Sequence, residues 1–185
     1  MPQAPSVLLY FFFDFNDTFK QSLDGLLRAL ISQLYVEQEI SRMHLNQLFL
    51  SYKHGKEKPS VERLEATLQA MAHQAGEIIV VLDALDEAQP REKLLGWMQG
   101  FVSSDFRNVH LIVTARREED ITSAISKWKH SENTISIRSD DVDEDIRAYV
   151  RARVDDDDDG LKRWKSRPDV QMEIETSLLK KTDGM

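Results

Sequence analysis

Three acidic side chains follow the most apolar segment of the sequence. Asp83 comes directly after Ile78–Leu82, and Asp86 and Glu87 follow it in "IIVVLDALDE". A carboxylate at the end of a buried strand can hold Mg²⁺, which takes one or two protein carboxylates and fills its shell with water and phosphate oxygens. A second carboxylate nearby can orient or deprotonate an attacking water. The spacing therefore predicts a metal ligand at Asp83 and a group acting on water at Asp86 or Glu87. The alternative is that the three acids cap the helix that follows, where the helix dipole favours negative charge.

A second polar group follows the next apolar segment along the chain. "VHLIVTARRE" ends in Thr114 and Arg116, so a hydroxyl and a guanidinium emerge at the end of a predicted strand. Arginine can bind a terminal phosphate through two parallel hydrogen bonds, which makes both residues candidates for sensing a nucleotide. For Arg116 alone, an ion pair with Glu118 or Glu119 at the start of a helix is an equal alternative.

The elements that would position these residues alternate between strands and helices. Apolar runs predict strands at Val7–Phe15, Ile78–Leu82, Val109–Thr114 and, more briefly, Thr134–Ser139. Helical spacing of apolar residues predicts helices over Leu23–Leu34, Met43–Tyr52, Ser60–Gly76, Arg91–Val102, Glu118–Lys129 and from Val142 onward, with an appended helical element in Leu161–Lys181. The acidic run Asp155–Gly160 is typical of a solvated helix end or linker, with a cation-binding role as the alternative. This order predicts an open parallel sheet with helices on both faces, which binds ligands outside the carboxyl ends of its strands.

Composition excludes several classes of function. The chain has 185 residues, of which 41% are hydrophobic, so it can bury a core. A formal charge of -8 and scattered basic residues argue against nucleic-acid binding. There is no cysteine, so disulfides and Cys-based zinc sites are excluded, and the expected compartment is the reducing cytoplasm. The five histidines lack metal-binding spacing, and no apolar run is long enough to predict a membrane span.

Five segments, in this order and spacing, resemble the NACHT domains of fungal NLR-like proteins, which are STAND-class P-loop NTPases: "YFFFDFND", "LLRALISQLY", "IIVVLDALDEA", "VHLIVTARREEDI" and "DVDEDIRAYVRARV". The resemblance implies that Asp83 is the Walker B aspartate, Asp86 and Glu87 the extended acidic pair, and Arg116 the sensor residue. It implies a nucleotide-binding core over residues 1–140 and the start of a helical subdomain over 141–185. It also implies Mg²⁺ with ATP or GTP, and self-association or assembly with other NACHT subunits.

The sequence departs from that family in its glycines. None of the seven glycines stands in a G-x-x-x-x-G-K-[ST] loop, and the one Gly-Lys pair, Gly55-Lys56, is followed by Glu57. Without such a loop there is no cradle of backbone N–H groups for phosphates. The expected fold is therefore a three-layer α/β sheet of P-loop NTPase type that lacks its first strand and phosphate loop and carries a partial helical extension. Two functions are expected: a nucleotide-binding core that is inactive alone, or a catalytically silent module for protein interaction and oligomerisation.

Overall fold

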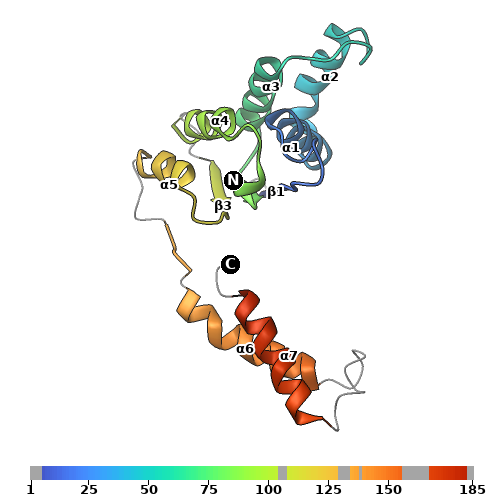
Figure 1. Cartoon of the computed structure of the whole chain (residues 1–185). Helices are drawn as coiled ribbons and strands as arrows, with labels where there is room; N and C mark the ends of the chain where they lie inside the picture. The colour runs from blue at the N-terminus through green and yellow to red at the C-terminus, as the bar shows by residue number, and fades with distance from the viewer. Residues whose placement is uncertain (1–5, 104–107, 129–133, 138, 156–166, 183–185) are drawn as a thin grey trace. The chain divides into compact units, whose positions relative to one another are not determined.

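A computed structural model describes residues 6–103, 108–128, 134–137, 139–155 and 167–182 (Figure 1). The chain divides into two compact units, residues 1–131 and 132–185. Within the described ranges, every helix is too short or too polar to cross a membrane.

The first unit alternates strands and helices, as the sequence predicts. Its strands are β1 (Val7–Phe12), β2 (Ile78–Asp83) and β3 (Val109–Val113). Its α-helices are α1 (Leu23–Glu37), α2 (Arg42–Ser51), α3 (Val61–Gln74), α4 (Arg91–Ser103) and α5 (Glu119–Ser126), with short 3-10 helices η1 (Glu39–Ser41) and η2 (Leu85–Glu87). Each predicted strand and helix of this unit is present. The observed ends of most helices differ by a few residues from the predicted ends.

Helix α1 shows why these segments fold as they do. Its apolar residues recur every three or four positions, so one stripe is buried while the other positions stay more exposed. The helix starts after Ser22, whose side chain accepts a hydrogen bond from the N–H of Gly25 at 3.1 Å. This cap satisfies one of the backbone donors that every helix leaves unpaired in its first turn.

The three strands form one parallel sheet in the order β1-β2-β3. Alternate residues, such as Leu9 and Val80, point into a core shared with α1, α3 and α4, and are almost completely buried. The residues between them are more exposed. The predicted α/β class and parallel sheet are confirmed, as a partial three-layer fold. The helices expected on both faces are found on one face only within the described residues, because alternate residues of the other face, such as Tyr10 and Phe12, are exposed.

Two amide side chains form hydrogen bonds with backbone groups at the border of the sheet. Asn108, just before β3, donates to the carbonyls of Ala72, Ala75 and Gly76 at 2.9–3.2 Å, so it ties the start of β3 to the end of α3. Gln33 of α1 donates to the carbonyl of Tyr10 at 2.8 Å and accepts from its N–H at 3.0 Å. Tyr10 turns these groups away from β2, so Gln33 satisfies them at the outer edge of β1.

The predicted fourth strand, Thr134–Ser139, is wrong for the residues that the structure describes. Residues 134–137 form no strand and are exposed, and Ser139 already belongs to helix α6 (Ser139–Asp155). Threonine and isoleucine favour an extended backbone, but a strand also needs a neighbour that pairs with its backbone, and β3 pairs only with β2 among the described strands.

The second unit contains α6 and α7 (Pro168–Thr182), joined by the ion pair of Arg151 with Glu175 at 2.7 Å. Pro168 starts α7, since proline suits the first helical position. Of the acidic run Asp155–Gly160, only Asp155, the last residue of α6, lies within the described residues.

Candidate functional site at the carboxyl edge of the sheet

A tight turn after β2 places the acidic residues. Ala84 adopts a left-handed backbone, with φ 58° and ψ 49°, and the chain then enters η2. Leu85 is fully buried, and its N–H donates to the carbonyl of Thr114 at 3.0 Å. The turn therefore holds Asp83 at the end of the strand and presents Asp86 and Glu87 one short helix later.

Asp83 is joined to Thr114 across the two strand ends. The Thr114 hydroxyl donates to Oδ1 of Asp83 and accepts the N–H of Ala84 at 3.1 Å. Asp83 lies in register with Phe12, so its side chain belongs to the sheet face that the core helices do not cover. The structure therefore brings together two predicted site residues, a carboxylate and a hydroxyl, at the carboxyl edge.

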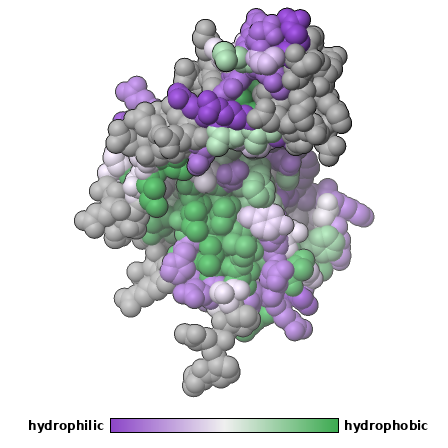
Figure 2. Space-filling model, turned by 90° about the horizontal axis from the view of Figure 1, so that it is seen from below, coloured by the Kyte–Doolittle hydropathy of each residue, from purple (hydrophilic) through white to green (hydrophobic). Residues whose placement is uncertain are grey.

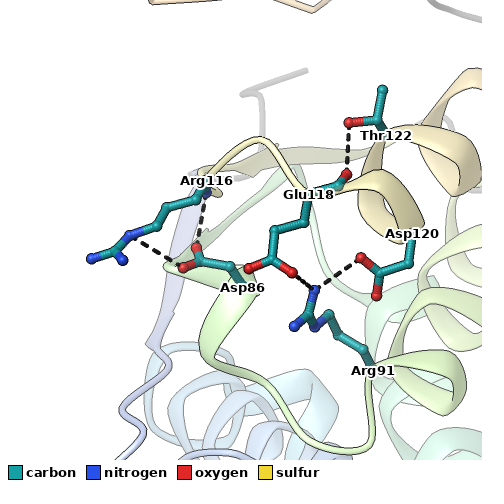
Figure 3. A network of polar contacts seen from close by, with 6 residues as sticks. All are labelled: Asp86, Arg91, Arg116, Glu118, Asp120 and Thr122. Atoms are coloured by element: carbon teal, nitrogen blue, oxygen red, sulfur yellow. Dashed lines mark hydrogen bonds and ion pairs between the residues drawn. The ribbon is translucent and has the colours of Figure 1, made fainter. Parts of the chain in front are cut away.

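Asp86 is joined to Arg116 by two contacts (Figure 3). Its Oδ1 accepts the backbone N–H of Arg116 at 2.9 Å, and its Oδ2 lies 3.6 Å from Nε of the guanidinium. The Asp86 side chain is only 9% exposed, whereas that of Arg116 is 70% exposed. Arg116 is therefore paired with Asp86 and not with Glu118 or Glu119, which was the alternative from sequence.

Glu87 connects the turn after β2 to the end of β1. Its Oε2 accepts the backbone N–H of Phe15, just beyond β1, at 2.9 Å. Together with the contacts of Asp83 and Asp86, this bond connects the carboxyl ends of all three strands. The bonds of these acids run to Phe15, Thr114 and Arg116, so capping of the α4 helix does not explain their positions.

A cavity of about 450 Å³ opens at this edge. It is lined by three carboxylates, one guanidinium, two amides and an aromatic ring, from Asp86, Glu87, Glu118, Arg116, Gln21, Gln89 and Phe15. Carboxylates outnumber cations, so the cavity by itself repels a phosphate and favours a cation. Of the five predicted site residues, Asp86, Glu87 and Arg116 line the cavity. The other two, Asp83 and Thr114, do not.

Arg91 is a polar residue of this region that sequence reasoning missed. It opens α4, is 17% exposed, and donates to Glu118 at 2.7 Å and to Asp120 at 2.9 Å (Figure 3). The hydrogen bond to Glu118, which outweighs partial burial, raises the pKa of Arg91. Its partners are 27 and 29 residues away, so only the acidic cluster "EED" beside β3 hinted at a cation nearby.

The metal chemistry of this edge depends on few protein ligands. Among the described residues, no group of three His, Cys, Asp or Glu side chains converges on one metal position. Asp83 and the Thr114 hydroxyl offer hard oxygen atoms of the kind that Mg²⁺ binds, but they leave most of a six-coordinate shell to water and phosphate. The residues fit a magnesium ion that arrives with a polyphosphate better than one held by protein alone.

Comparison with known families gives one match. The family model described as "Nephrocystin 3, N-terminal" matches residues 2–116. That range contains all three strands and every predicted site residue from Asp83 to Arg116. No curated protein matches the chain.

Proposed function

The chain belongs to the nephrocystin 3 N-terminal family, and from this premise we propose that it is the nucleotide-binding core of a NACHT-type signalling switch in the cytoplasm. In this proposal the carboxyl edge of the sheet carries the metal and sensor side of an ATP or GTP site. The observation that carries the proposal is the convergence of Asp83, Thr114, Asp86, Glu87 and Arg116 from neighbouring parallel strands at one edge.

Asp83 and Thr114 would hold the magnesium ion. Asp83 has a carboxylate at the end of the central strand, and Thr114 fixes its orientation through the hydroxyl hydrogen bond. Magnesium bound with phosphates supplies positive charge to phosphate oxygens. That charge is needed here, because a phosphate near the cavity would otherwise meet three carboxylates.

Arg116 is suited to sense a phosphate. Asp86 contacts its backbone N–H and Nε, which fixes the base of the side chain, while the side chain remains largely exposed. In Figure 3 the end of the guanidinium extends beyond Asp86 and away from Arg91. This leaves the planar end of the group for two parallel bonds to phosphate oxygens.

Glu87 is better placed than Asp86 to act on water. Asp86 is nearly buried and uses both oxygens on Arg116. Glu87 uses Oε2 on Phe15, lines the cavity, and is only partly buried. We therefore assign the orientation of an attacking water to Glu87 and the positioning of Arg116 to Asp86.

The sequence lacks a phosphate-binding loop, so we expect this chain to bind nucleotide weakly and not to hydrolyse it. The test is a titration with fluorescent ATP and GTP analogues, with and without Mg²⁺. It compares the 185-residue chain with a version extended upstream through a G-x-x-x-x-G-K-[ST] loop.

We expect tight, Mg²⁺-dependent binding only in the extended version, and its loss in Asp83→Asn. The control is Asp145→Asn on α6, an exposed carboxylate in the second unit. Failure of the extended version to bind, or equal binding by Asp83→Asn, would refute the proposal. Tight binding by the 185-residue chain would show that the phosphate loop is dispensable.

A second candidate function is a catalytically silent module for protein interaction or oligomerisation, with copies of this chain or other NACHT subunits as partners. It is favoured by a specific observation, the exposed apolar face of the sheet, where Leu8, Tyr10, Phe12 and Ile112 are each at least half exposed. Sedimentation velocity of the chain alone and with Ile112→Lys tests whether this face joins copies of the chain.

A further inference from the structure

The first unit exposes a second apolar area besides the open face of its sheet. The open face lies on the side of the molecule that Figure 2 shows, where apolar side chains form an extended area. The second area is on helix α2, which lies at another end of the unit in Figure 1. There Met43, Phe49 and Leu50 are 50–59% exposed.

Helix α2 is apolar on both of its sides. Leu48 is buried against the core, which is the usual place for an apolar residue of a surface helix. Met43 and Leu50 are seven positions apart, so they share the outer side of the helix. Apolar side chains gathered on an exposed side indicate a contact surface.

The loop that follows α2 is basic. Residues 40–56 form the longest stretch of the chain without an acidic residue, although the whole chain has a formal charge of -8. Lys53 is paired with Glu57, whereas Lys56 and Lys58 are exposed and pair with no residue that the structure describes. Because exposed charges more than about 8 Å apart are largely screened in physiological salt, this loop presents its own positive charge to a partner.

The backbone of the loop is fixed by its own hydrogen bonds. Lys53, His54 and Gly55 have positive φ values of 52°, 58° and 79°. The N–H of His54 donates to the carbonyl of Phe49 at 3.0 Å, and that of Gly55 donates to Tyr52 at 3.0 Å. A side-chain carbon at Gly55 would lie 2.9 Å from the Phe49 ring, so the loop packs directly on this ring. These contacts hold the basic loop beside the exposed apolar end of α2.

A lipid surface with anionic headgroups matches both features at once. Its headgroups attract the two unpaired lysines, and the boundary of its acyl chains accepts apolar side chains at a depth of about 5–10 Å. A nucleic acid requires several phosphate contacts and gains nothing from exposed methionine and leucine side chains. An acidic peptide matches the lysines but offers little apolar surface to α2.

We propose that the outer side of α2 and the loop of residues 53–58 form a contact site for an anionic lipid surface. Lys56 and Lys58 bind the headgroups, and Met43 and Leu50 enter the layer beneath them. The contact is peripheral and reversible, since it has few charges and few apolar side chains. It uses no residue of the carboxyl edge or of the open sheet face, so it goes beyond both functions proposed above and rests on neither.

The test is flotation of the full 185-residue chain with lipid vesicles at low salt. Vesicles of phosphatidylcholine alone are compared with vesicles that also contain about one third phosphatidylserine. We expect binding to the anionic vesicles only. Binding should be lost in about 1 M salt, where the screening length falls to about 3 Å.

Substitution of the lysines tests the charge of the site. Lys56→Gln combined with Lys58→Gln should weaken binding about tenfold or more, since each lysine near an anionic surface contributes about fivefold. Lys20→Gln combined with Lys127→Gln is the matched control, because it removes the same charge from exposed positions elsewhere on the first unit. It should change binding by less than about twofold.

Substitution of a leucine tests the apolar part of the site. Leu50→Asn should weaken binding about tenfold. Leu8→Asn on the open sheet face is the matched control, since the two leucines are 59% and 58% exposed. It should bind like the parent chain. Circular dichroism verifies that all these variants, which change exposed side chains, remain folded.

A fluorescent label locates the contact. The chain has no cysteine, so Ser51→Cys at the end of α2 and Ser123→Cys on α5 each accept a single environment-sensitive fluorophore. Both serines are exposed. Anionic vesicles should shift the emission to the blue in Ser51→Cys, as the fluorophore leaves water, and leave that of Ser123→Cys unchanged.

Four results would overturn the proposal. Absence of binding to anionic vesicles would refute it directly, and equal binding to neutral vesicles would remove the role of the lysines. Loss of binding in Leu8→Asn but not in Leu50→Asn would assign the contact to the open sheet face. Binding of a polyglutamate peptide that prevents vesicle binding, without a blue shift in Ser51→Cys, would make an acidic polypeptide the occupant.

Discussion

Asp86 holds Arg116 by its backbone as well as by its side chain, with Oδ1 2.9 Å from the N–H and Oδ2 3.6 Å from Nε. The two contacts differ in consequence. The backbone bond fixes the chain that leaves β3, because its acceptor, Asp86, is nearly buried and has little freedom to move. The side-chain contact is longer and exposed, so the guanidinium can move to a ligand without loosening the turn.

Substitution of Asp86 separates these roles. Asp86→Asn keeps an oxygen for the N–H of Arg116 and is expected to retain most of the stability. Asp86→Ala removes that hydrogen bond and should lower the free energy of unfolding by about 1 kcal/mol, because the exposed N–H can turn to water. Urea denaturation followed by circular dichroism measures both variants. Equal losses for Asn and Ala would contradict the assignment of the backbone bond.

The left-handed turn at Ala84 predicts a stabilising change. Its φ of 58° is costly for a residue with a side chain and free for glycine. Ala84→Gly is therefore expected to raise the free energy of unfolding by up to about 1 kcal/mol. Ala66→Gly in the exposed middle of α3 should lower it by about 1 kcal/mol. If the turn geometry is right, the urea midpoints of Ala84→Gly and Ala66→Gly shift in opposite directions.

Gln33 predicts a change in association. Gln33→Ala removes the amide that occupies Tyr10 and so exposes a second unpaired sheet edge beside the apolar face. We expect light scattering to show more self-association of this variant on concentration. Gln47→Ala, at an exposed position of α2, is the control and should behave like the parent chain. A parent-like Gln33→Ala would mean that water replaces the amide without consequence.

Glu65 of α3 predicts a dependence on pH. Burial, followed by the charge of Glu62, raises the pKa of Glu65 above 4.5. The folded state therefore binds the Glu65 proton more tightly than the unfolded state does, and this contribution to stability is lost as the pH rises through the raised pKa. Glu65→Gln should raise the urea midpoint at pH 7, where the charge opposes folding, but not well below pH 4. A gain of equal size at both pH values would point to packing of the amide instead.

The strands and helices of the first unit could be predicted from the sequence, because each depends on a local pattern of apolar residues. The stripe from Leu23 to Leu34 can only be buried as a helix, and a run such as Ile78–Leu82, bounded by the acids Glu77 and Asp83, is a buried strand. Thr134–Ile137 shows the limit of that signal. Its residues favour an extended chain, yet a strand depends on a pairing partner that no local pattern reports.

The residues of the candidate site could be predicted from local patterns, but their bonding partners could not. Asp83, Asp86 and Glu87 were found because they follow a strand, and Thr114 and Arg116 because they follow the next one. Which partner each would take could not be predicted, because the bonds cross about 30 residues of chain or more, as in the bond of Glu87 to Phe15, 72 residues away. Arg91 was missed for the same reason.

The order of the strands in space matches their order along the chain. During synthesis, β2 finds β1 already made, and β3 finds β2, so each pairing can form as soon as its second strand leaves the ribosome. The helices of one face can gather over the strands in that same succession. Assembly of the core can therefore proceed from the amino end without waiting for α6 and α7.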